Sequence, residues 1–573
     1  MGNHFNKEFV KGASFEQLHK LCDEMRERIF TTVSECGGHL SSNLGAVELT
    51  VALYRVFDFP KDKIVFDVGH QCYPHKLLSG RAERFSTLRK EGGLSGFPKR
   101  SESEFDCYDT GHAGTAVSAA LGIAKARDLK GEDFSVIAFV GDGSFNNGLV
   151  YEALNSLKIL NAPILVILND NGMSIAPTVG GTHDILSEMN GAGGGKNVAL
   201  FEQFGIQYLG LYDGNNVEES IHALEKAKGL LKNGSVLLHV HTKKGYGYAF
   251  CENAPDVTHG ISPTKNVKDE EYSTALGEEL TTLAQKNGRI VVITAAMTDS
   301  LGLRGFFDKF PERSFDVGIC EEHASVLCAA MATEGLKPYY AIYSTFLQRA
   351  YDEIIHDVCG QNLPVTFCID RAGITGADGE THHGVFDLSY LALIPNLTVA
   401  IPSCISEFRA MIKWSETFEK PLAIRYPRSG KAVEIEISPI EYGKFDVLHS
   451  SMSDITVIAA GERPLSFAKN VLAKRQKEGK DFTLINARFL KPLDEALLSS
   501  VSSKYVITIE DNVEIGGLGA AINRFYLNQG KIIRNFAYHD AFIPHGGIVS
   551  LSEKFGVSEA EIDEYLEEIY ARG

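Results

Sequence analysis

The sequence lacks any apolar run long enough to cross a membrane. Its longest runs, such as PILVIL at 163–168, have the length of buried strands, whereas a membrane helix needs about 20 apolar residues. The first residues also lack a cationic segment followed by an apolar one, so no secretory signal is expected. These absences argue against a membrane partner and favour a cytoplasmic location.

Positive charge is also scarce. The 573 residues include 56 Lys and Arg against 74 Asp and Glu, a net charge of −18, and no basic run offsets it. Proteins that bind phosphate backbones normally neutralise them with clustered Lys and Arg, so we expect no nucleic-acid partner. Hydrophobic residues make up 44% and charged residues 23%, which is ordinary for a globular chain and excludes disorder as the dominant state.

The ten cysteines contain no C-x-x-C pair. Scattered cysteines argue against both a zinc site and a disulfide framework. We therefore expect free thiols and a reducing compartment.

What the sequence does contain is an alternation of short apolar runs with amphipathic stretches such as 148–158 and 463–475. The runs are apolar throughout, which is typical of strands covered on both faces in a parallel sheet. At about 150 residues per domain, the length suits three or four domains. The alternation predicts three doubly wound parallel-sheet α/β domains, the third sheet being either parallel or mixed. The predicted strands include 134–140, 163–169, 289–294, 364–370, 455–461 and 505–511.

Two polar segments suggest the domain boundaries. One lies near 260–272 and contains a proline and several charges, and the other lies near 430–450, after the strand-like PLAIRYP. The predicted domains are residues 1–265, 266–435 and 436–573.

The first chemical signal is a Gly-Asp-Gly at 141–143 that directly follows a predicted strand. The next predicted strand ends in Asn169-Asp170-Asn171, and 29 residues separate Asp142 from Asn171, the length of one crossover helix. Both side chains should therefore emerge at the carboxyl ends of neighbouring parallel strands, where α/β sheets bind ligands. Asp and Asn oxygens suit Mg²⁺ or Ca²⁺ rather than zinc, and Mg²⁺ keeps positions open for phosphate oxygens. A metal-bound diphosphate is predicted here.

The second signal is the acidic pair Glu321-Glu322, which opens a predicted helix after the strand-like run at 314–320. Carboxylates in a first helical turn are commonly explained by the helix dipole alone. The Asp142–Asn171 pair, however, resembles the metal–diphosphate motif of thiamine diphosphate enzymes. Such enzymes need one glutamate to bind the aminopyrimidine ring of the cofactor.

Longer strings resemble the 1-deoxy-D-xylulose-5-phosphate synthase family, in order and over nearly the whole chain. They are DVGHQ at 67–71, YPHK at 73–76, GGLSGFPKRSESE at 92–104, AIYSTFLQRAYD at 341–352, DRAGITGADGETHHG at 370–384 and INARFLKPLD at 485–494.

The resemblance implies a transketolase-like fold and a transferase of known type. Residues 1–265 would bind the diphosphate and metal, 266–435 the pyrimidine, and 436–573 would be a transketolase C-terminal-like domain. The enzyme would decarboxylate pyruvate on thiamine diphosphate with Mg²⁺. It would then join the two-carbon unit to glyceraldehyde 3-phosphate, a step in isoprenoid and thiamine synthesis. The family also implies a homodimer.

The resemblance further implies a set of site residues. The implied catalytic residues are Glu321, His39, His70, His382, Asp378 and Tyr343. The implied cofactor contacts are His70, His112, Ala113, Gly114, Gly143, Ser144, Asn171, Tyr248, Glu321 and Phe346. The implied metal ligands are Asp142, Asn171 and the main-chain carbonyl of Met173. The implied substrate contacts are Arg371, Arg428, Tyr343 and His39. We expect His75, His323 and His383 to be ordinary or supporting residues.

Some positions depart from the family pattern. The usual Gly-His-Ser-Ser-Thr is Gly-His-Ala-Gly-Thr at 111–115, and a further acid, Glu322, follows the activating glutamate. These departures leave two alternatives open. One is another transketolase-like thiamine enzyme with a different donor or acceptor, and the other is a catalytically weakened paralogue.

Overall fold

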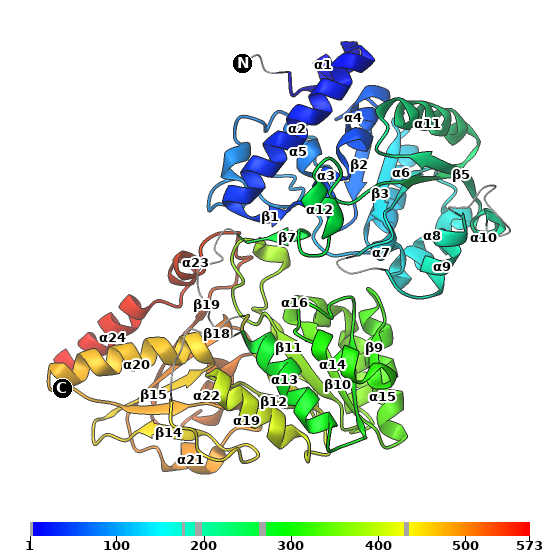
Figure 1. Cartoon of the computed structure of the whole chain (residues 1–573). Helices are drawn as coiled ribbons and strands as arrows, with labels where there is room; N and C mark the ends of the chain where they lie inside the picture. The colour runs from blue at the N-terminus through cyan, green and yellow to red at the C-terminus, as the bar shows by residue number, and fades with distance from the viewer. Residues whose placement is uncertain (1–3, 175–177, 190–197, 263–270, 429–434, 573) are drawn as a thin grey trace. The chain divides into compact units, whose positions relative to one another are not determined.

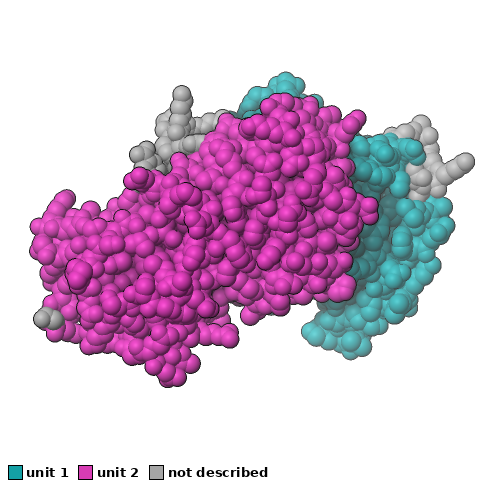
Figure 2. Space-filling model, turned by 90° about the horizontal axis from the view of Figure 1, so that it is seen from below, with its two compact units in different colours: residues 1–266, 318–320 teal, residues 267–317, 321–573 magenta. Residues whose placement is uncertain are grey.

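A computed structural model of the chain describes residues 4–174, 178–189, 198–262, 271–428 and 435–572. The chain divides into two compact units. Unit 1 contains residues 1–266 and 318–320, and unit 2 contains residues 267–317 and 321–573, shown in teal and magenta in Figure 2. Parts of both predicted boundary segments, 263–270 and 429–434, lie outside the described residues. Within the described ranges, no helix is long and apolar enough to span a membrane.

Unit 1 is built on a five-stranded sheet whose neighbouring strands are all parallel (Figure 1). In sheet order the strands are β2 (Lys63–Phe66), β3 (Val136–Gly141), β4 (Leu165–Asp170), β6 (Ser235–His241) and β5 (Ile206–Asp213). A separate antiparallel pair joins β1 (Gly38–His39) to β7 (Gly260–Ile261). This pairing brings together segments that lie more than 200 residues apart in the sequence.

The sheet of unit 1 has a hydrophobic core on each face. Alternate residues of β3 point to different cores: Ile137 and Phe139 belong to one, and Val136, Ala138 and Val140 to the other. This follows from the two-residue period of a strand. The first core includes side chains of α2 (Phe15–Cys36), α4 (Val47–Val56) and α11 (Val217–Leu230), and the second those of α6 (Ala116–Lys130) and α8 (Gly148–Leu160). The uninterrupted apolar runs of the sequence are thereby explained.

Unit 2 contains two further sheets. The first has seven strands: β17 (Phe489–Lys491), β12 (Thr398–Ala400), β13 (Leu422–Arg425), β11 (Thr366–Asp370), β10 (Lys337–Tyr343), β8 (Ile290–Thr294) and β9 (Ser314–Asp316). All neighbours are parallel except β12 and β17. The sheet is therefore mixed, and its edge strand β17 comes from the predicted third domain. The strand predicted over 314–320 ends earlier, at Asp316.

The second sheet of unit 2 is also mixed. Its order is β14 (Asp446–His449), β16 (Thr483–Asn486), β15 (Ile455–Ala460), β18 (Tyr505–Val513) and β19 (Ile532–Tyr538), with only β14 antiparallel to its neighbour. Val457 lies in a core with α20 (Glu462–Lys477) and α24 (Glu559–Arg572), whereas Ile458 lies in a core with α22 (Leu518–Phe525). Helices thus cover both faces, as in a doubly wound sheet.

The remaining α-helices precede, connect or follow these strands along the chain. In unit 1 they are α1 (Lys7–Gly12), α3 (Ser41–Leu44), α5 (Tyr73–Leu78), α7 (Asp142–Phe145), α9 (Gly181–Met189), α10 (Val198–Gln203) and α12 (Ala249–Asn253). In unit 2 they are α13 (Tyr272–Ala284), α14 (Arg304–Lys309), α15 (Glu321–Thr333), α16 (Ser344–Leu347), α17 (Tyr351–Glu353), α18 (Asp387–Ala392), α19 (Ile405–Ser415), α21 (Glu495–Ser500) and α23 (Ile548–Lys554).

Candidate active site

Two predicted metal ligands follow neighbouring strands of the unit 1 sheet. Asp142 begins α7 directly after β3, and Asn171 directly follows β4. β3 and β4 are parallel neighbours, with Gly141 paired to Asn169. The backbone N–H of Asn171 donates to Oδ1 of Asp142 at 3.3 Å. The predicted adjacency of these two residues is confirmed.

The oxygens at these strand ends fit a divalent cation. Oδ1 of Asn171 is buried and accepts no hydrogen bond within the described residues. Burial first, and then the charge of Asp170, raise the pKa of Asp142 to about 7. An under-compensated carboxylate beside an unpartnered amide oxygen is a donor set suited to Mg²⁺. Nowhere in the described ranges do three His, Cys, Asp or Glu side chains converge as a metal-binding group.

A buried lysine lies close to this carboxylate. Lys244 is 5% exposed, and its Nζ donates to the main-chain carbonyl of Ser174. Burial lowers the pKa of Lys244 to about 8, and the charge of Asp142 opposes that shift. The sequence analysis did not assign Lys244 to the site. The Lys243-Lys244 pair by itself does not distinguish a buried site lysine from two surface charges.

Two glycines in the predicted diphosphate loops occupy crowded positions. Gly114 has a φ of +90°, and a Cβ there would overlap the side chain of Asn147. A Cβ on Gly143 would lie 2.7 Å from the Cβ of Ser174. Only glycine fits such positions without a shift of the backbone or its neighbours. Ala113 and Ser144 are buried next to them, and His112 is partly buried.

Asp67 holds the Gly114 loop in place. Its carboxylate oxygens accept hydrogen bonds from the backbone N–H groups of Gly114 at 2.8 Å and Ala116 at 3.0 Å. Asp67 follows β2, so this loop is tied to the sheet that also carries Asp142. The predicted diphosphate loop and metal ligands therefore belong to one framework in unit 1.

Three histidines form a compact group in unit 1. The ring centroids of His39 and His70 lie 5.5 Å apart, and His259 lies 5.3 Å from His39 and 5.5 Å from His70. The pKa of both His70 and His259 lies well below 6.5, chiefly through burial. Neutral imidazoles can accept a proton or a hydrogen bond from a substrate.

His259 was not predicted from the sequence. It enters the group because β1 and β7 pair, with His39 opposite Gly260. Its Nδ1 also lies 3.2 Å from Oγ of Ser42. Nothing in the sequence around 259 pairs it with residue 39, so only the tertiary structure reveals it.

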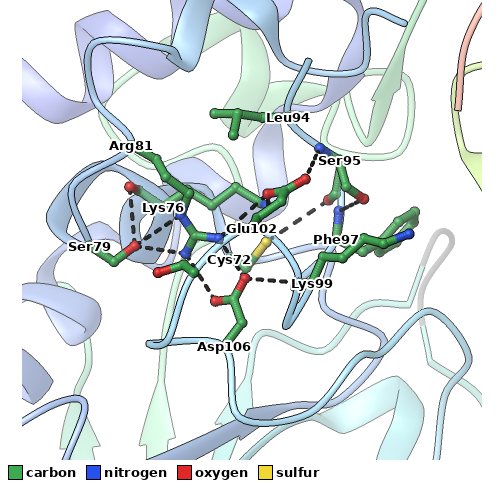
Figure 3. Close-up of polar contacts among 12 residues, drawn as sticks. Cys72, Lys76, Ser79, Arg81, Leu94, Ser95, Phe97, Lys99, Glu102 and Asp106 are labelled. Atoms are coloured by element: carbon green, nitrogen blue, oxygen red, sulfur yellow. Dashed lines mark hydrogen bonds and ion pairs between the residues drawn. The ribbon is translucent and has the colours of Figure 1, made fainter. Parts of the chain in front are cut away.

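A buried charge cluster supports the loop at 95–99, which forms a wall beside His39. The cluster, drawn in part in Figure 3, consists of His75, Lys76, Arg81, Glu102 and Asp106. Lys76 donates to Glu102 at 2.7 Å, and Arg81 bonds both oxygens of Asp106.

The acids of this cluster also bind the backbone of 95–99. The N–H of Ser95 donates to Glu102 at 2.5 Å, and that of Lys99 donates to Asp106 at 2.8 Å. Phe97, between them, packs edge-on against the ring of His39 at 5.8 Å. The cluster thus fixes the loop that shapes one side of the histidine group.

The predicted cofactor-activating glutamate lies in unit 2, at the start of α15. Glu321 is 3% exposed, and burial raises its pKa while Arg349 opposes the shift. Nη1 of Arg349 donates to Oε2 of Glu321 at 3.3 Å. The sequence analysis assigned no role to Arg349. The structure places it as the charged partner of Glu321.

Four predicted residues of unit 2 form a row of side chains in which each contacts the next. The guanidinium of Arg371 lies over the ring of Tyr343 at 4.2 Å, and Tyr343 stacks on Phe346 at 5.6 Å with an interplanar angle of 13°. Phe346 in turn meets the ring of His382 edge-on at 5.7 Å. The strings 341–352 and 370–384 are therefore neighbours in space, and their predicted residues form one surface.

The charges of both predicted phosphate-binding arginines, Arg371 and Arg428, favour the ionised form of one buried carboxylate, that of Asp370. Nη1 of Arg371 donates to Oδ2 of Asp370 at 2.8 Å, and its backbone N–H donates to Oδ1 at 2.6 Å. Burial raises the pKa of Asp370, and the charges of Arg371 and then Arg428 oppose it. Arg371 is partly buried, with its side chain 11% exposed, whereas Arg428 is exposed.

The other predicted residues have individual positions. Asp378 precedes the short 3₁₀ turn at Gly379–Thr381, in the same segment as His382. Met173 is partly buried and stands two residues after Asn171. Tyr248 stacks on Phe30 at 4.7 Å, so its contact with a cofactor stays a prediction.

Comparison with known proteins identifies the family. A model described as 1-deoxy-D-xylulose-5-phosphate synthase matches residues 4–198 and 192–242, the transketolase pyrimidine-binding domain matches 269–431, and the transketolase C-terminal domain matches 443–562. The 1-deoxy-D-xylulose-5-phosphate synthase of Clostridium tetani is 44% identical, with 96% of this chain and 97% of that protein covered. The chain belongs to the 1-deoxy-D-xylulose-5-phosphate synthase family.

A second synthase extends the match to almost the whole chain. The 1-deoxy-D-xylulose-5-phosphate synthase of Carboxydothermus hydrogenoformans is 44% identical over 99% of this chain and 98% of its own length. Among solved structures, a split-gene transketolase is 27% identical over 52% of this chain and 97% of its own, with a TM-score of 0.48. The transketolase of Campylobacter jejuni is 19% identical over 97% of this chain and 100% of its own, with a TM-score of 0.45. Because these scores are below 0.5, the family assignment rests on the sequence matches.

Proposed function

We propose that the chain is a 1-deoxy-D-xylulose-5-phosphate synthase. It would take pyruvate and glyceraldehyde 3-phosphate, release CO₂ and form 1-deoxy-D-xylulose 5-phosphate. The observation that carries the proposal is the 44% identity to synthases of that name over nearly the full length of both chains. The grouping of the predicted residues into two clusters, one in each unit, supports it.

The cofactor we propose is thiamine diphosphate with Mg²⁺. Asp142, Asn171 and the carbonyl of Met173 would hold the metal, and the loops at Gly114 and Gly143 would admit the diphosphate. His112, Ala113, Ser144 and Tyr248 would complete the contacts with the cofactor. When bound, thiamine diphosphate supplies the carbon centre that makes decarboxylation of a keto acid possible.

Glu321 is proposed to bind the pyrimidine ring. A raised pKa favours the protonated carboxyl, which can donate a hydrogen bond to a ring nitrogen. Arg349 fixes the orientation of that carboxyl through Oε2. Phe346 would stack on the pyrimidine ring. Its own ring is held in place by Tyr343, which stacks on it, and by His382, which meets it edge-on.

The histidines and arginines would handle the substrates. His39, His70 and His259, all in unit 1, are proposed to accept and return protons. Tyr343, Asp378 and His382, all in unit 2, would contact the aldehyde. Arg371 and Arg428 would bind its phosphate, because guanidinium groups match phosphate oxygens in pairs.

We also propose three domains, a homodimer and a cytoplasmic location. The matches to separate transketolase domains at 269–431 and 443–562 support boundaries near 265 and 435. The ten cysteines are free thiols, which suits a reducing compartment. The homodimer is proposed from the family.

The proposed function is tested by following both substrates. Purified protein with thiamine diphosphate, Mg²⁺, pyruvate and glyceraldehyde 3-phosphate should consume the two substrates in equal amounts and release one CO₂ per pyruvate. The Asp142→Asn variant should bind Mg²⁺ more weakly in the presence of the cofactor, as measured by calorimetry. Turnover of a ketose phosphate without release of CO₂ would instead indicate a transketolase.

A further inference from the structure

The segment 371–384 contains three of the proposed substrate residues, Arg371, Asp378 and His382, but little regular structure of its own. Its only helical turn is the 3₁₀ turn at Gly379–Thr381. Two reciprocal hydrogen bonds close its base: the N–H of Gly373 donates to the carbonyl of Gly384 at 2.7 Å, and the N–H of Gly384 donates to that of Gly373 at 2.8 Å. Such a loop needs outside contacts to keep its side chains in one place, because ordering each residue costs about 1–2 kcal/mol of entropy.

The base of the segment rests on Asp511, in strand β18 of the C-terminal sheet. Gly373 has a φ of +76°, and a Cβ there would overlap the Asp511 carboxylate. Two residues of the C-terminal region hold that carboxylate in place. Tyr538 donates its hydroxyl to Oδ1, and Arg463 donates to Oδ2 at 3.3 Å.

A buried arginine ties the same base to the strand. Nη2 of Arg425 donates to the carbonyl of Asp511 at 2.5 Å and to that of Gly384 at 3.3 Å. Its Nε pairs with Asp387 at 2.9 Å. Arg425 is 3% exposed, so breaking this bridge would leave a buried charge without its partners.

The segment also contacts a second part of the C-terminal region, through His383 beside the base and through Gly376 nearer the tip. Nδ1 of His383 accepts the N–H of Thr375 at 3.0 Å, which leaves Nε2 to donate to the carbonyl of Pro544 at 3.2 Å. Burial lowers the pKa of His383 to about 4, in keeping with this neutral form. Gly546 donates its N–H to the carbonyl of Gly376 at 3.3 Å.

We propose that residues 436–573 position the substrate end of the active site. Asp511, Tyr538 and the 544–546 turn act as positioning residues that hold Asp378 and His382 through the base and tip of segment 371–384. This role goes beyond the proposed function and rests on it only for the identity of the substrate. A displacement of about 1 Å at such residues is enough to slow a reaction strongly.

The test compares two buried tyrosines of the C-terminal region. Tyr538→Phe removes the hydroxyl that holds Asp511, and Tyr526→Phe removes a hydroxyl that donates to the carbonyl of Leu498 at 2.7 Å, away from the segment. In Tyr538→Phe we expect hydrogen exchange in 371–385 to become about tenfold faster. The kcat/KM for the aldehyde should fall about tenfold, with less than a twofold change for pyruvate. Tyr526→Phe should resemble the wild type in all three measurements.

A second pair of variants tests the contact between His383 and Pro544. His383→Ala should speed exchange in 371–385, and His383→Gln, whose amide can still accept and donate, should retain more protection. Equal exchange in Tyr538→Phe and Tyr526→Phe would overturn the proposal, as would an equal loss of kcat/KM for both substrates. The exchange data decide the positioning role even if the wild type makes no deoxyxylulose phosphate, a result that would refute the proposed function alone.

Discussion

At the scale of single residues, Glu321 and Arg349 form the pair on which cofactor activation is proposed to depend. Glu321 is buried with its pKa raised, and Arg349 is the charged group that opposes this shift. A carboxyl held in this way can present a proton at a fixed atom. Neither the neighbouring Glu322 nor the exposed His323 has this environment.

Glu321→Ala should therefore remove nearly all activity. General acid–base groups contribute about 10²- to 10⁴-fold, so we expect kcat to fall by at least about 100-fold while the protein still folds. Steady-state assays and a thermal melt measure the two effects. The matched control is Glu322→Gln, which should keep activity within about threefold of the wild type, since loss of a partly exposed charge has little effect.

Two outcomes of these assays would contradict a catalytic role for Glu321. A Glu321→Ala variant as active as the wild type would show that Glu321 is not a catalytic residue. So would an equal loss in Glu322→Gln, because that would point to the helix terminus rather than to one carboxyl.

Residues were predictable from the sequence where spacing fixed their geometry. Asp142 and Asn171 each follow a strand, and parallel neighbours bring strand ends together. His259 and Arg349 could not be found in this way. His259 depends on pairing between β1 and β7, and Arg349 depends on how the 344–350 turns pack against α15.

At the scale of elements, the buried charge cluster between α5 and the 94–106 loop can be tested directly by mutation. Asp106 is surrounded by His75 and Arg81, and although burial alone would raise its pKa, these partners hold it well below the usual range. Buried ion pairs add little net stability, but removing one partner is costly. The cluster therefore serves to fix geometry.

Asp106→Asn should destabilise unit 1 and reduce activity. Leaving Arg81 without its bidentate partner costs on the order of 3 kcal/mol, and the loss of the Lys99 contact loosens the wall that carries Phe97. A thermal melt and kcat/KM for pyruvate measure these effects. Asp299→Asn is the control: Asp299 pairs with Arg304 at 2.8 Å, but with the two side chains 41% and 52% exposed, so about 1 kcal/mol or less is expected. Equal destabilisation by both variants would contradict the assignment.

Glu510, in strand β18 with its carboxylate at the start of α22, should make the C-terminal sheet pH-sensitive. Its carboxylate accepts the N–H groups of Leu518 and Gly519, and burial raises its pKa to about 7. The two N–H groups and the charge of Arg425 oppose that rise. The pKa in the folded state is above the value of 4.5 in the unfolded chain. The proton therefore contributes stability that is complete below pH 4.5 and is lost as the pH rises through 7.

The measurement is a series of thermal melts from pH 5 to pH 8 with the wild type and Glu510→Gln. The variant has no proton to lose, so the wild type should lose several degrees of melting temperature relative to it as the pH rises. Two parallel curves over this range would show that Glu510 titrates at its ordinary pKa.

The elements of the fold were predicted well where the sequence pattern is local. The expected strands at 163–169 and 455–461 correspond to β4 and β15. The pattern could not predict that β17 would leave the third domain to join the seven-stranded sheet, because a three-residue strand has no period of its own and its antiparallel pairing with β12 is a tertiary choice. The mixed character of the seven-stranded sheet follows from that one strand.

At the scale of the whole molecule, the scarcity of positive charge has a local counterpart. The net charge is −18, yet the proposed cofactor and both substrates are anions. The groups that would bind them are few: a metal at Asp142 and Asn171 in unit 1, and Arg371 and Arg428 in unit 2. Because repulsion between the acidic chain and anionic substrates is screened over about 8–10 Å in physiological salt, these local charges would govern binding.

The most direct test of this account is the fate of labelled pyruvate in the complete enzyme. With [2-¹³C]pyruvate, glyceraldehyde 3-phosphate, thiamine diphosphate and Mg²⁺, the account predicts one ¹³C-labelled ketone carbon in 1-deoxy-D-xylulose 5-phosphate, with unlabelled CO₂ released in equal amount. Label remaining in pyruvate, or label in a product that lacks the three carbons of the aldehyde, would contradict it.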